Sequence, residues 1–427
     1  MLLLLAFVGV SVASLALKAL NLRYQVREGT EVPPELAGAV DADRLRRIAA
    51  YTRDRARFAM LTELLRDVGL GVFVFGGFLG VYDRFVAELA DSALARGVLF
   101  FIGLSLGAAV LAIPSSLYSS FRIEAKHGFN RMSAQLFWSD WVKGTLLSVV
   151  FVAALSAGAL WLVAHAPGSW WLYVWALFVG VGILVTFVTP YVIEPLFFTM
   201  KPLHVPGLED EVRALAERAG VHVSRVLEVD ASRRSSHSNA YFTGVGAVKR
   251  VVLFDTLFGH MTHGEILAIL AHELGHWRKH HVLFRTLWSF VVALGALYLA
   301  YRLAPAAGLP ALVGLDEASF PARLFILGVA ASVASFPLTP LASYWSRRHE
   351  WQADAYATEL QRRPEDLASA LQKLASENLS NLHPHPLYAA FYYSHPPMPE
   401  RIRRLRSSAQ GFGRHVSEAP PAHAQPS

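Results

Sequence analysis

Residues 271–303 read AHELGHWRKHHVLFRTLWSFVVALGALYLAYRL and place two patterns side by side. The first is His-Glu-x-x-His, formed by His272, Glu273 and His276. Residues four apart lie on the same face of a helix, so both imidazoles can reach one metal ion. The second is the apolar run from Val282 to Leu303, which has the length of about 20 residues that a helix needs to cross a bilayer. We therefore predict a metal-site helix that runs straight into a membrane span.

The composition of the whole chain favours a membrane protein. Of the 427 residues, 54% are hydrophobic and 17% are charged, and the mean hydropathy is +0.36. A soluble domain carries about 25% charged residues. Runs of about 20 apolar residues recur along the chain and predict about seven spans. They lie at 1–20, 61–82, 94–118, 146–165, 170–193, 282–303 and 320–344.

The charges between these runs predict how the spans are oriented. The segment 41–57 carries arginines at positions 44, 46, 47, 53, 55 and 57, and the positive-inside rule places such a segment in the cytoplasm. Residues 1–20 have no basic segment before the apolar run and no small-residue cleavage site, which indicates a retained anchor rather than a signal peptide. Alternation from this anchor places the polar stretch 201–281 and the Arg-rich C-terminal part in the cytoplasm as well.

The charge balance and the cysteine count exclude several other classes. The net charge is +6, but Lys and Arg flank apolar runs, so we expect membrane lipids and no nucleic acid as partners. There is no cysteine, so the chain forms no disulfide and must bind any metal through histidines and carboxylates.

The polar stretch 201–281 has a secondary-structure pattern of its own. It contains an amphipathic helix, three short strand-like segments and a final helical segment, and these lie at 208–218, 223–229, 240–242, 251–254 and 259–281. We therefore predict a mainly α, polytopic membrane protein with a small α+β domain between spans five and six. The expected regions are a membrane region at 1–200, a catalytic domain at 201–281, two spans at 282–345, a C-terminal part that completes the site at 346–406, and a disordered tail at 407–427.

A catalytic zinc takes three protein ligands and leaves a fourth position open for water, so the two histidines need a third partner. Glu350 is the best candidate. Asp354 lies four residues later and can accept a hydrogen bond from the far nitrogen of a ligating histidine. The same spacing is explained equally well by a solvated helix face, on which the carboxylates pair with the neighbouring arginines.

Three further histidines are weaker candidates for the metal. On a continuous helix, His280 is rotated by about 80° from His272 and displaced by about 12 Å along the axis. His280 and His281 therefore suit the surface better than the metal site. His349 competes with Glu350 for the third position and is the weaker of the two.

Glu273 and the segment 394–401 supply the other groups that hydrolysis needs. Zinc lowers the pKa of its bound water towards about 7, and Glu273 can accept the water's proton and deliver it to the leaving amine. A donor to the oxyanion is also required. His395 and Arg401 are available in SHPPMPER, although a Pro-rich turn before a basic helix accounts for this segment equally well.

Several motifs taken together resemble one known family. They are FRIEAKHGFN at 121–130, SRRSSHSNAYF at 232–242, the segment 250–257, the His-Glu-x-x-His helix, Glu350 with Asp354, and the segment 395–401. In this order, across nearly the whole chain, they are similar to those of the type 1 CAAX prenyl endopeptidases, which are seven-span integral-membrane zinc proteases.

The resemblance implies roles that the spacing alone leaves open. It implies that Glu350 is the third ligand of a single Zn²⁺ and that Asp354 supports a ligating histidine. It also implies that His395 and Arg401 contact substrate near the metal. The residues Asn239, Ala240, Tyr241 and Phe242 are implied to form an edge strand that pairs with the substrate backbone.

The expected function is therefore zinc-dependent peptide hydrolysis at a membrane. The resemblance implies cleavage near the C-terminus of lipid-bearing or membrane-inserted peptides. The alternatives are a general protease that degrades misfolded membrane proteins and a catalytically silent scaffold, against which the presence of Glu273 argues. Arg234 and the Ala-, Arg- and Gly-rich composition indicate a bacterial inner-membrane protein with its active site towards the cytoplasm, and many bacteria make no prenylated CAAX proteins.

Overall fold

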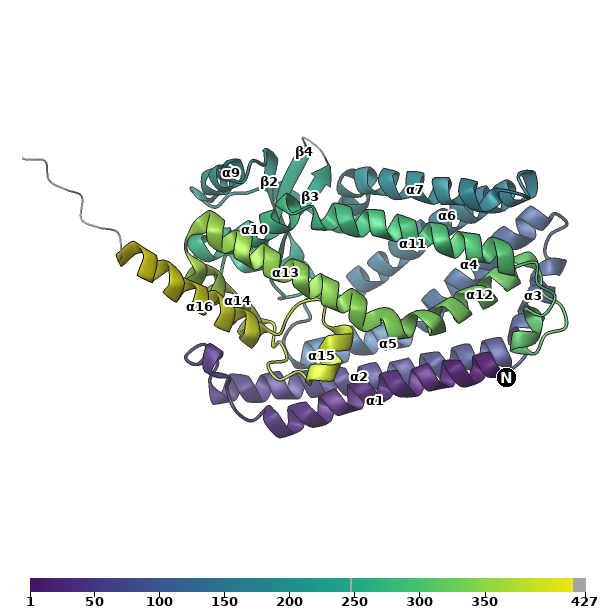
Figure 1. Ribbon diagram of the computed structural model, residues 1–427, viewed down its shortest axis with the longest axis horizontal. Coiled ribbons are helices and arrows are strands. Elements are labelled where there is room, and N and C mark those ends of the chain that lie inside the picture. The colour runs from purple at the N-terminus through teal and green to yellow at the C-terminus, as the bar shows by residue number, and fades with distance from the viewer. Residues whose placement is uncertain (246–247, 418–427) are drawn as a thin grey trace, which may run out of the picture.

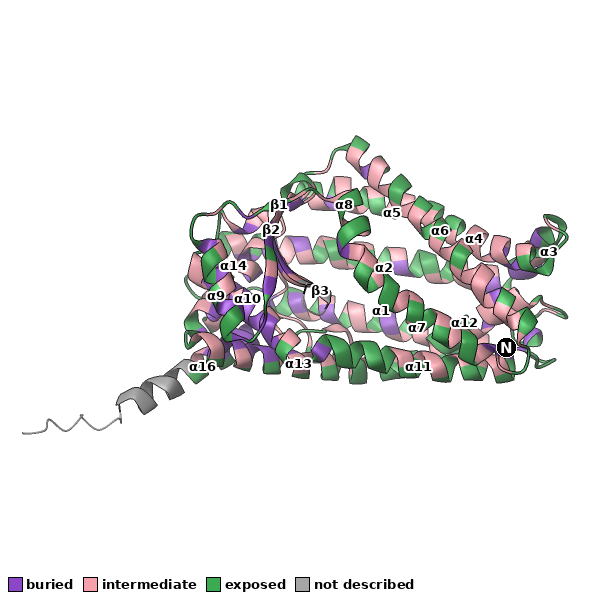
Figure 2. Ribbon diagram, turned by 90° about the horizontal axis from the view of Figure 1, so that it is seen from above, coloured by how far each residue is buried: buried purple, intermediate pink, exposed green. Residues whose placement is uncertain are grey.

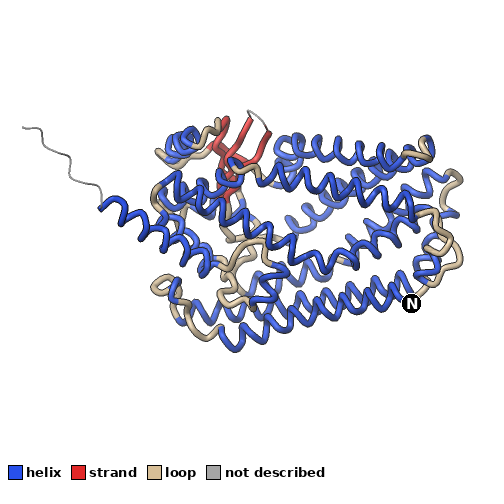
Figure 3. The backbone as a smooth tube through the Cα atoms, in the orientation of Figure 1, coloured by secondary structure: helices blue, strands red, loops and turns tan. Residues whose placement is uncertain are grey.

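The computed structural model describes residues 1–245 and 248–417. Long helices run along the longest axis of the molecule, and a small mixed domain closes one end of this bundle (Figure 1). The strands gather at that end, while the rest of the described chain consists of helices and their connections (Figure 3). The predicted architecture of a helical membrane protein with a small α+β domain is confirmed.

The spans pack side by side, and α12 contacts both α11 and α1, so the helices surround one another rather than lie in an open row. α1 packs on α2, α4 on α6, α6 on α7 and α7 on α11. The helices of this region are α1 (Leu2–Glu28), α2 (Ala42–Phe75), α3 (Phe78–Glu88), α4 (Ala93–Leu111), α5 (Ile113–Tyr118), α6 (Ala134–His165), α7 (Trp170–Val188), α8 (Glu194–Phe197), α11 (His281–Leu303), α12 (Phe320–Ser335) and α13 (Thr339–Gln361). In the described residues, 6 helices or helix runs are long and apolar enough to cross a membrane, and one bent pair raises this to 7.

The bent pair corrects the second predicted span. α2 and α3 meet at an angle of 66°, so the run at 61–82 is not one straight helix. The bend lies at Gly76 and Gly77, and Gly77 has a left-handed backbone with φ of 85°. Glycine adopts this conformation without the steric penalty that a side chain would add, which is why an apolar run can turn here.

The domain at the end of the bundle is built on a sheet with strand order β1-β2-β4-β3. β2 and β4 are parallel, and the other two pairs are antiparallel. The elements are β1 (Met200–Pro202), α9 (Leu208–Arg218), β2 (Val223–Val229), β3 (Ala240–Val245), β4 (Val248–Phe254) and α10 (His263–Arg278). The predicted helix and three strands are present. β1 was not predicted, because three residues ending in proline have no readable alternation.

Burial differs between the two ends of the molecule. Buried residues concentrate in the mixed domain, whereas the outer faces of the spans are largely exposed (Figure 2). Leu253, Leu257, Leu270 and Leu274 are fully buried between the sheet and its helices. Large apolar side chains such as Trp288 remain exposed on the spans, as expected where lipid replaces water as the solvent.

The C-terminal part folds back onto the mixed domain through α14 (Pro364–Glu377), α15 (Pro386–Tyr392) and α16 (Met398–Ser417). The prediction of disorder from residue 407 is wrong up to Ser417, because the helix anchored by buried Ile402 and Leu405 continues beyond its packed part. The remainder of the predicted tail, 418–427, lies outside the described residues.

The helix with the His-Glu-x-x-His pattern has well-defined ends. It starts with a capping box in which Thr262 and Glu265 each bond the other's backbone N–H. Glu265 also accepts hydrogen bonds from Ser369 and Lys373 of α14 at 2.6 and 2.7 Å. The predicted continuous run into the next span is wrong, because His280 has a φ of 58° and separates α10 from α11.

Gly275 lets α10 and α13 cross at close range. A Cβ atom at this position would lie 2.9 Å from the Ala353 Cα and 3.0 Å from its carbonyl oxygen. Real Cβ atoms do not approach backbone atoms so closely, so the crossing requires glycine. The same crossing brings Glu350, one turn before Ala353, to the side of α10 that carries His272.

We predict that Gly275→Ala lowers the apparent unfolding temperature in detergent. Overpacking costs about 1–3 kcal/mol, which exceeds the roughly 1 kcal/mol that alanine gains over glycine within a helix. Differential scanning fluorimetry checks this. Gly295→Ala on α11 is the matched control, since an added Cβ there meets no described atom within 4 Å. Equal stability of the two variants would contradict the close crossing.

Candidate active site

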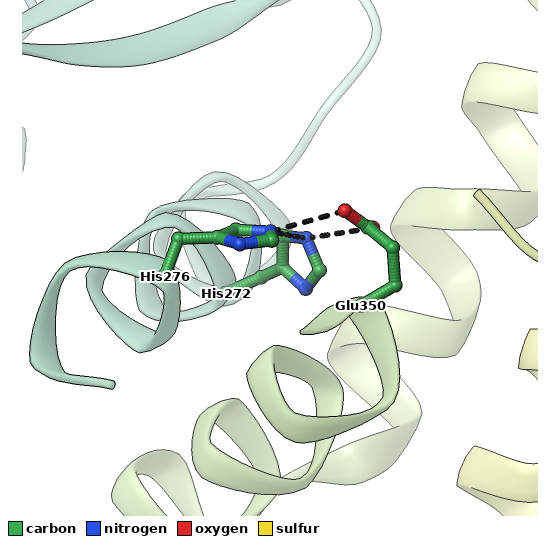
Figure 4. A group of neighbouring side chains, drawn as sticks. All are labelled: His272, His276 and Glu350. Carbon is green, nitrogen blue, oxygen red and sulfur yellow. Dashed lines mark hydrogen bonds and ion pairs between the residues drawn. The ribbon is translucent and has the colours of Figure 1, made fainter. Parts of the chain in front are cut away.

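Three side chains from two helices converge on one point. His272 and His276 project from α10 towards Glu350 on α13 (Figure 4). His272 Nε2 lies 3.2 Å from His276 Nε2 and 3.4 Å from Glu350 Oε2, and His276 Nε2 lies 3.2 Å from Glu350 Oε1. One ligand atom from each residue lies within 4.8 Å of the other two.

These distances fit a bound metal ion. In a tetrahedral site with bonds of about 2.0–2.1 Å, ligand atoms lie about 3.3 Å from one another. Glu350 Oε2 is buried and has no well-formed hydrogen bond among the described residues, with His272 Nε2 at 3.4 Å and Arg401 Nη1 at 3.7 Å, so a metal ion between the ligand atoms would compensate its burial. Glu350 is therefore not on a solvated helix face, and the alternative interpretation of its spacing is excluded.

Asp354 fixes the orientation of His272. Its Oδ1 lies 2.8 Å from His272 Nδ1, so this nitrogen donates a hydrogen and Nε2 is left with a lone pair directed at the metal position. Arg401 holds the same carboxylate through two hydrogen bonds of 2.7 and 2.9 Å. Burial alone would lower the pKa of His272, but the hydrogen bonds with Asp354 and Glu350 outweigh it and raise the pKa to about 9 in the metal-free site.

His281 plays the corresponding part for His276. Its Nε2 donates to the Gln352 Oε1 at 2.7 Å, which leaves Nδ1 to accept from His276 Nδ1 at 3.1 Å. His276 Nε2 is then free for a metal. His281 is buried, so the prediction of a surface position is wrong for this residue, whereas His280 is exposed as predicted.

The left-handed backbone at His280 is the physical reason for the error. On a continuous helix His281 would point about 140° away from His276, but the break turns it back towards the metal position. His349 stacks on His281 with ring centroids 4.2 Å apart and so lies one layer outside the ligands.

Glu273 lies beside the metal position, and its carboxylate has no partner among the described residues. It makes no hydrogen bond or ion pair with any described residue. Burial raises its pKa, and a nearby cation would act in the opposite direction. An unpaired carboxylate with a raised pKa next to a metal has the properties of a general base.

His395 approaches the site from the C-terminal part. Its Nε2 lies 3.3 Å from Glu350 Oε1, and its side chain is 59% exposed, so it can also contact a ligand. Arg347 holds the start of the loop that carries it, because its Nη1 donates to the carbonyl oxygens of Ala389 and Ala390 in α15 and of Tyr393 directly after this helix. Arg401, in contrast, is buried and paired with Asp354.

The segment 239–242 lies next to α10, the helix with the His-Glu-x-x-His pattern. Residues 240–242 belong to β3, which is the edge strand of the sheet, and Asn239 directly precedes it. β3 is close to α10, and its other side pairs with no strand in the described residues.

Sequence reasoning missed three residues of this site. His281 is hidden because the break at His280 cannot be read from helical periodicity. Gln352 and Arg347 lie on the same helix as Glu350 and match no metal-site pattern. No pattern of residues along 347–354 distinguishes them in the sequence.

We predict that His281→Phe weakens Zn²⁺ binding by about 10–100-fold, because phenylalanine fills the space but cannot accept the hydrogen from His276. Competition with a chromogenic chelator measures the affinity. The neighbouring variant His280→Asn, which preserves a residue tolerant of the left-handed backbone, serves as the control and should bind Zn²⁺ as the unaltered protein does. Unchanged affinity in His281→Phe would contradict the assigned hydrogen bond.

Comparisons with known proteins agree with this geometry. A family model described as CAAX prenyl protease N-terminal, five membrane helices, matches residues 23–199, and one described as Peptidase family M48 matches residues 202–409. The crystal structure of S. mikatae Ste24p has a TM-score of 0.86 and 29% identity, covering 95% of this chain and 99% of that one.

Curated relatives match over most of their length. The CAAX prenyl protease 1 homolog of Oryza sativa subsp. japonica is 32% identical over 395 residues, covering 88% of this chain and 90% of the relative. CAAX prenyl protease 1 of Saccharomyces cerevisiae is 31% identical over 409 residues, covering 90% of each. The chain, with its His-Glu-x-x-His helix and glutamate set in a bundle of membrane helices, therefore belongs to peptidase family M48, in the group of the CAAX prenyl protease 1 metalloproteases.

Proposed function

We propose that this metalloprotease is a zinc-dependent endopeptidase that cuts lipid-bearing or membrane-inserted peptides near their C-terminus. The observation that carries the proposal is the cluster of His272, His276 and Glu350 with the uncommitted carboxylate of Glu273 beside it. A structural zinc site needs no general base and is closed by a fourth ligand, whereas this cluster has three ligands and a base.

The ligand set supports zinc as the metal, one ion per chain. Two imidazoles and a carboxylate in tetrahedral spacing suit Zn²⁺, and the chain has no cysteine that would favour a thiolate site. When bound, zinc would polarise the scissile carbonyl and make a water molecule more acidic. His272, His276 and Glu350 would hold it.

The residues around the metal position have separate roles in the hydrolysis. Glu273 accepts the proton of the attacking water and delivers it to the leaving amine nitrogen. His395, exposed and adjacent to Glu350, donates a hydrogen bond to the oxygen on which negative charge develops. The sequence-based expectation that Arg401 contacts substrate is not part of this proposal, because its guanidinium is buried against Asp354; we assign it a positioning role.

The free edge of β3 is proposed to bind the substrate backbone. Residues Ala240, Tyr241 and Phe242 would hydrogen-bond an extended peptide as an added strand, with Asn239 at its entrance. This orientation passes the peptide along α10 and presents its scissile bond to Glu273. Main-chain pairing gives little sequence selectivity, so the lipid or the membrane must supply much of the discrimination.

Two further features support the substrate class and the side of the membrane. The curated relatives are named CAAX prenyl proteases, and the chain spans about nine-tenths of their length. The start of the Arg-rich α2 lies at the same end as the catalytic domain, where Arg44 donates to Ser376 at 3.0 Å. The positive-inside rule then places the active site towards the cytoplasm, and we propose a bacterial inner membrane as its location.

We predict that purified protein cleaves a farnesylated CAAX peptide and leaves its unlipidated twin uncut. Mass spectrometry of the products measures both reactions in detergent. Equal cleavage of the two peptides would indicate a general membrane-protein protease, and cleavage of neither by a zinc-loaded protein would indicate a scaffold.

We predict that Glu273→Gln lowers kcat by about 10²–10⁴-fold while the protein retains its Zn²⁺, because the amide cannot accept the proton but the three ligands are untouched. Metal content by atomic emission accompanies the rate measurement. A chelator should abolish cleavage by the unaltered protein, and added Zn²⁺ should restore it. Retained activity in Glu273→Gln would exclude Glu273 as the base.

We predict that Arg347→Ala lowers kcat by up to about 100-fold, because the loop that carries His395 loses the hydrogen bonds that position it. The double variant Arg347→Ala/His395→Ala should be no slower than His395→Ala alone, since both changes act through one side chain. Steady-state kinetics of the single and double variants test this. Additive losses would show that Arg347 acts independently of His395.

A further inference from the structure

A groove opens beside the C-terminal end of α10, and Glu273 is not among its lining residues. It lies where α10 turns into α11 and where α13 passes alongside, and its volume is about 570 Å³. Pockets for small ligands have volumes of about 300–1,000 Å³. The groove does not include the metal ligands, but His281 and His349 form part of its lining.

One part of the groove is cationic. Lys279 and His280 line it from the turn after α10, and Arg348 lines it from α13. No acidic side chain lines the groove in the part of the chain that the structure describes. Two cationic side chains without a lining carboxylate form a site for an anion, and both Lys279 and Arg348 are exposed.

The other part of the groove is apolar and continues along a membrane span. Leu283 and Leu287 lie on α11, are 54% and 53% exposed, and line the groove together with Trp345 of α13. The Arg348 guanidinium lies 5.7 Å from the centroid of the Trp345 ring. α11 is one of the helices apolar enough to cross a membrane, so its leucines face acyl chains while Lys279 lies at its end.

We propose that this groove binds an anionic phospholipid. The headgroup phosphate binds Lys279 and Arg348, and an acyl chain lies along Leu283 and Leu287 against Trp345. A free phosphate ion would satisfy the cations but not the leucines and tryptophan, and a neutral lipid would satisfy only the apolar part. The order of the two parts along α11 matches the order of headgroup and chain in a bilayer leaflet.

The position of the groove connects the lipid to the catalytic centre. The stacked rings of His281 and His349 separate the groove from His276, and His281 is the hydrogen-bond partner of that ligand. A bound headgroup therefore lies one layer of side chains from the metal position. This binding site does not depend on the substrate class proposed above, because neither Glu273 nor a residue of β3 lines the groove.

Native mass spectrometry of the full-length protein with phosphatidylglycerol or phosphatidylcholine tests the proposal. We expect phosphatidylglycerol to bind in preference, and Lys279→Ala/Arg348→Ala to weaken its binding by about tenfold or more. The matched control is Arg53→Ala/Arg57→Ala, which removes two exposed cations from α2 without touching the groove. Its binding of phosphatidylglycerol should be unchanged.

Three results would overturn the proposal. They are equal binding of the two lipids, equal losses in the groove variant and the control, and displacement of phosphatidylglycerol by inorganic phosphate alone. A photoactivatable phosphatidylglycerol provides a second measurement on the unaltered protein, which is independent of whether the variant folds. We expect it to label peptides that contain Leu283, Leu287 or Trp345, and labelling confined to other spans would contradict the assigned site.

Discussion

The close crossing of α10 and α13 is the contact on which the active site depends. Gly275 lets the backbone of Ala353 approach to a distance that no other residue permits, and the helices then present His272, His276 and Glu350 to one another. A side chain at position 275 would separate the helices and with them the ligands. The glycine within His-Glu-x-x-His thus has a geometric function as definite as those of the histidines.

The buried side chains of the active site carry more negative than positive charge. Among the described residues, the carboxylates of Glu273, Glu350 and Asp354 lie near one guanidinium, that of Arg401. Three negative charges against one positive charge leave a deficit of two, which a divalent cation would cancel. Buried charges are expensive unless paired, so the protein gains from metal binding in addition to any catalytic benefit. In the metal-free site, the hydrogen bonds with Asp354 and Glu350 raise the pKa of His272, which is the direction expected beside excess negative charge.

The sequence predicts most of the architecture because its signals are long or chemically distinctive. The spans are runs of about 20 apolar residues, and the five-residue pattern at 272–276 combines two metal-binding side chains with a base on one helical face. Two features that the sequence did not predict depend on single backbone angles. The bend at Gly77 and the break at His280 each need one residue with positive φ, and the second of these moved His281 from the surface to the metal centre. The periodicity of the residues around Gly77 and His280 indicates neither the bend nor the break.

The order of the parts along the chain has a consequence for biosynthesis. His272 and His276 are made early in the second half of the chain, but the residue that holds the partner of His272 is Arg401, close to the C-terminus. The loop with His395 also comes late. A ribosome-bound chain that has not yet released α16 therefore has all three metal ligands without the support that orients them.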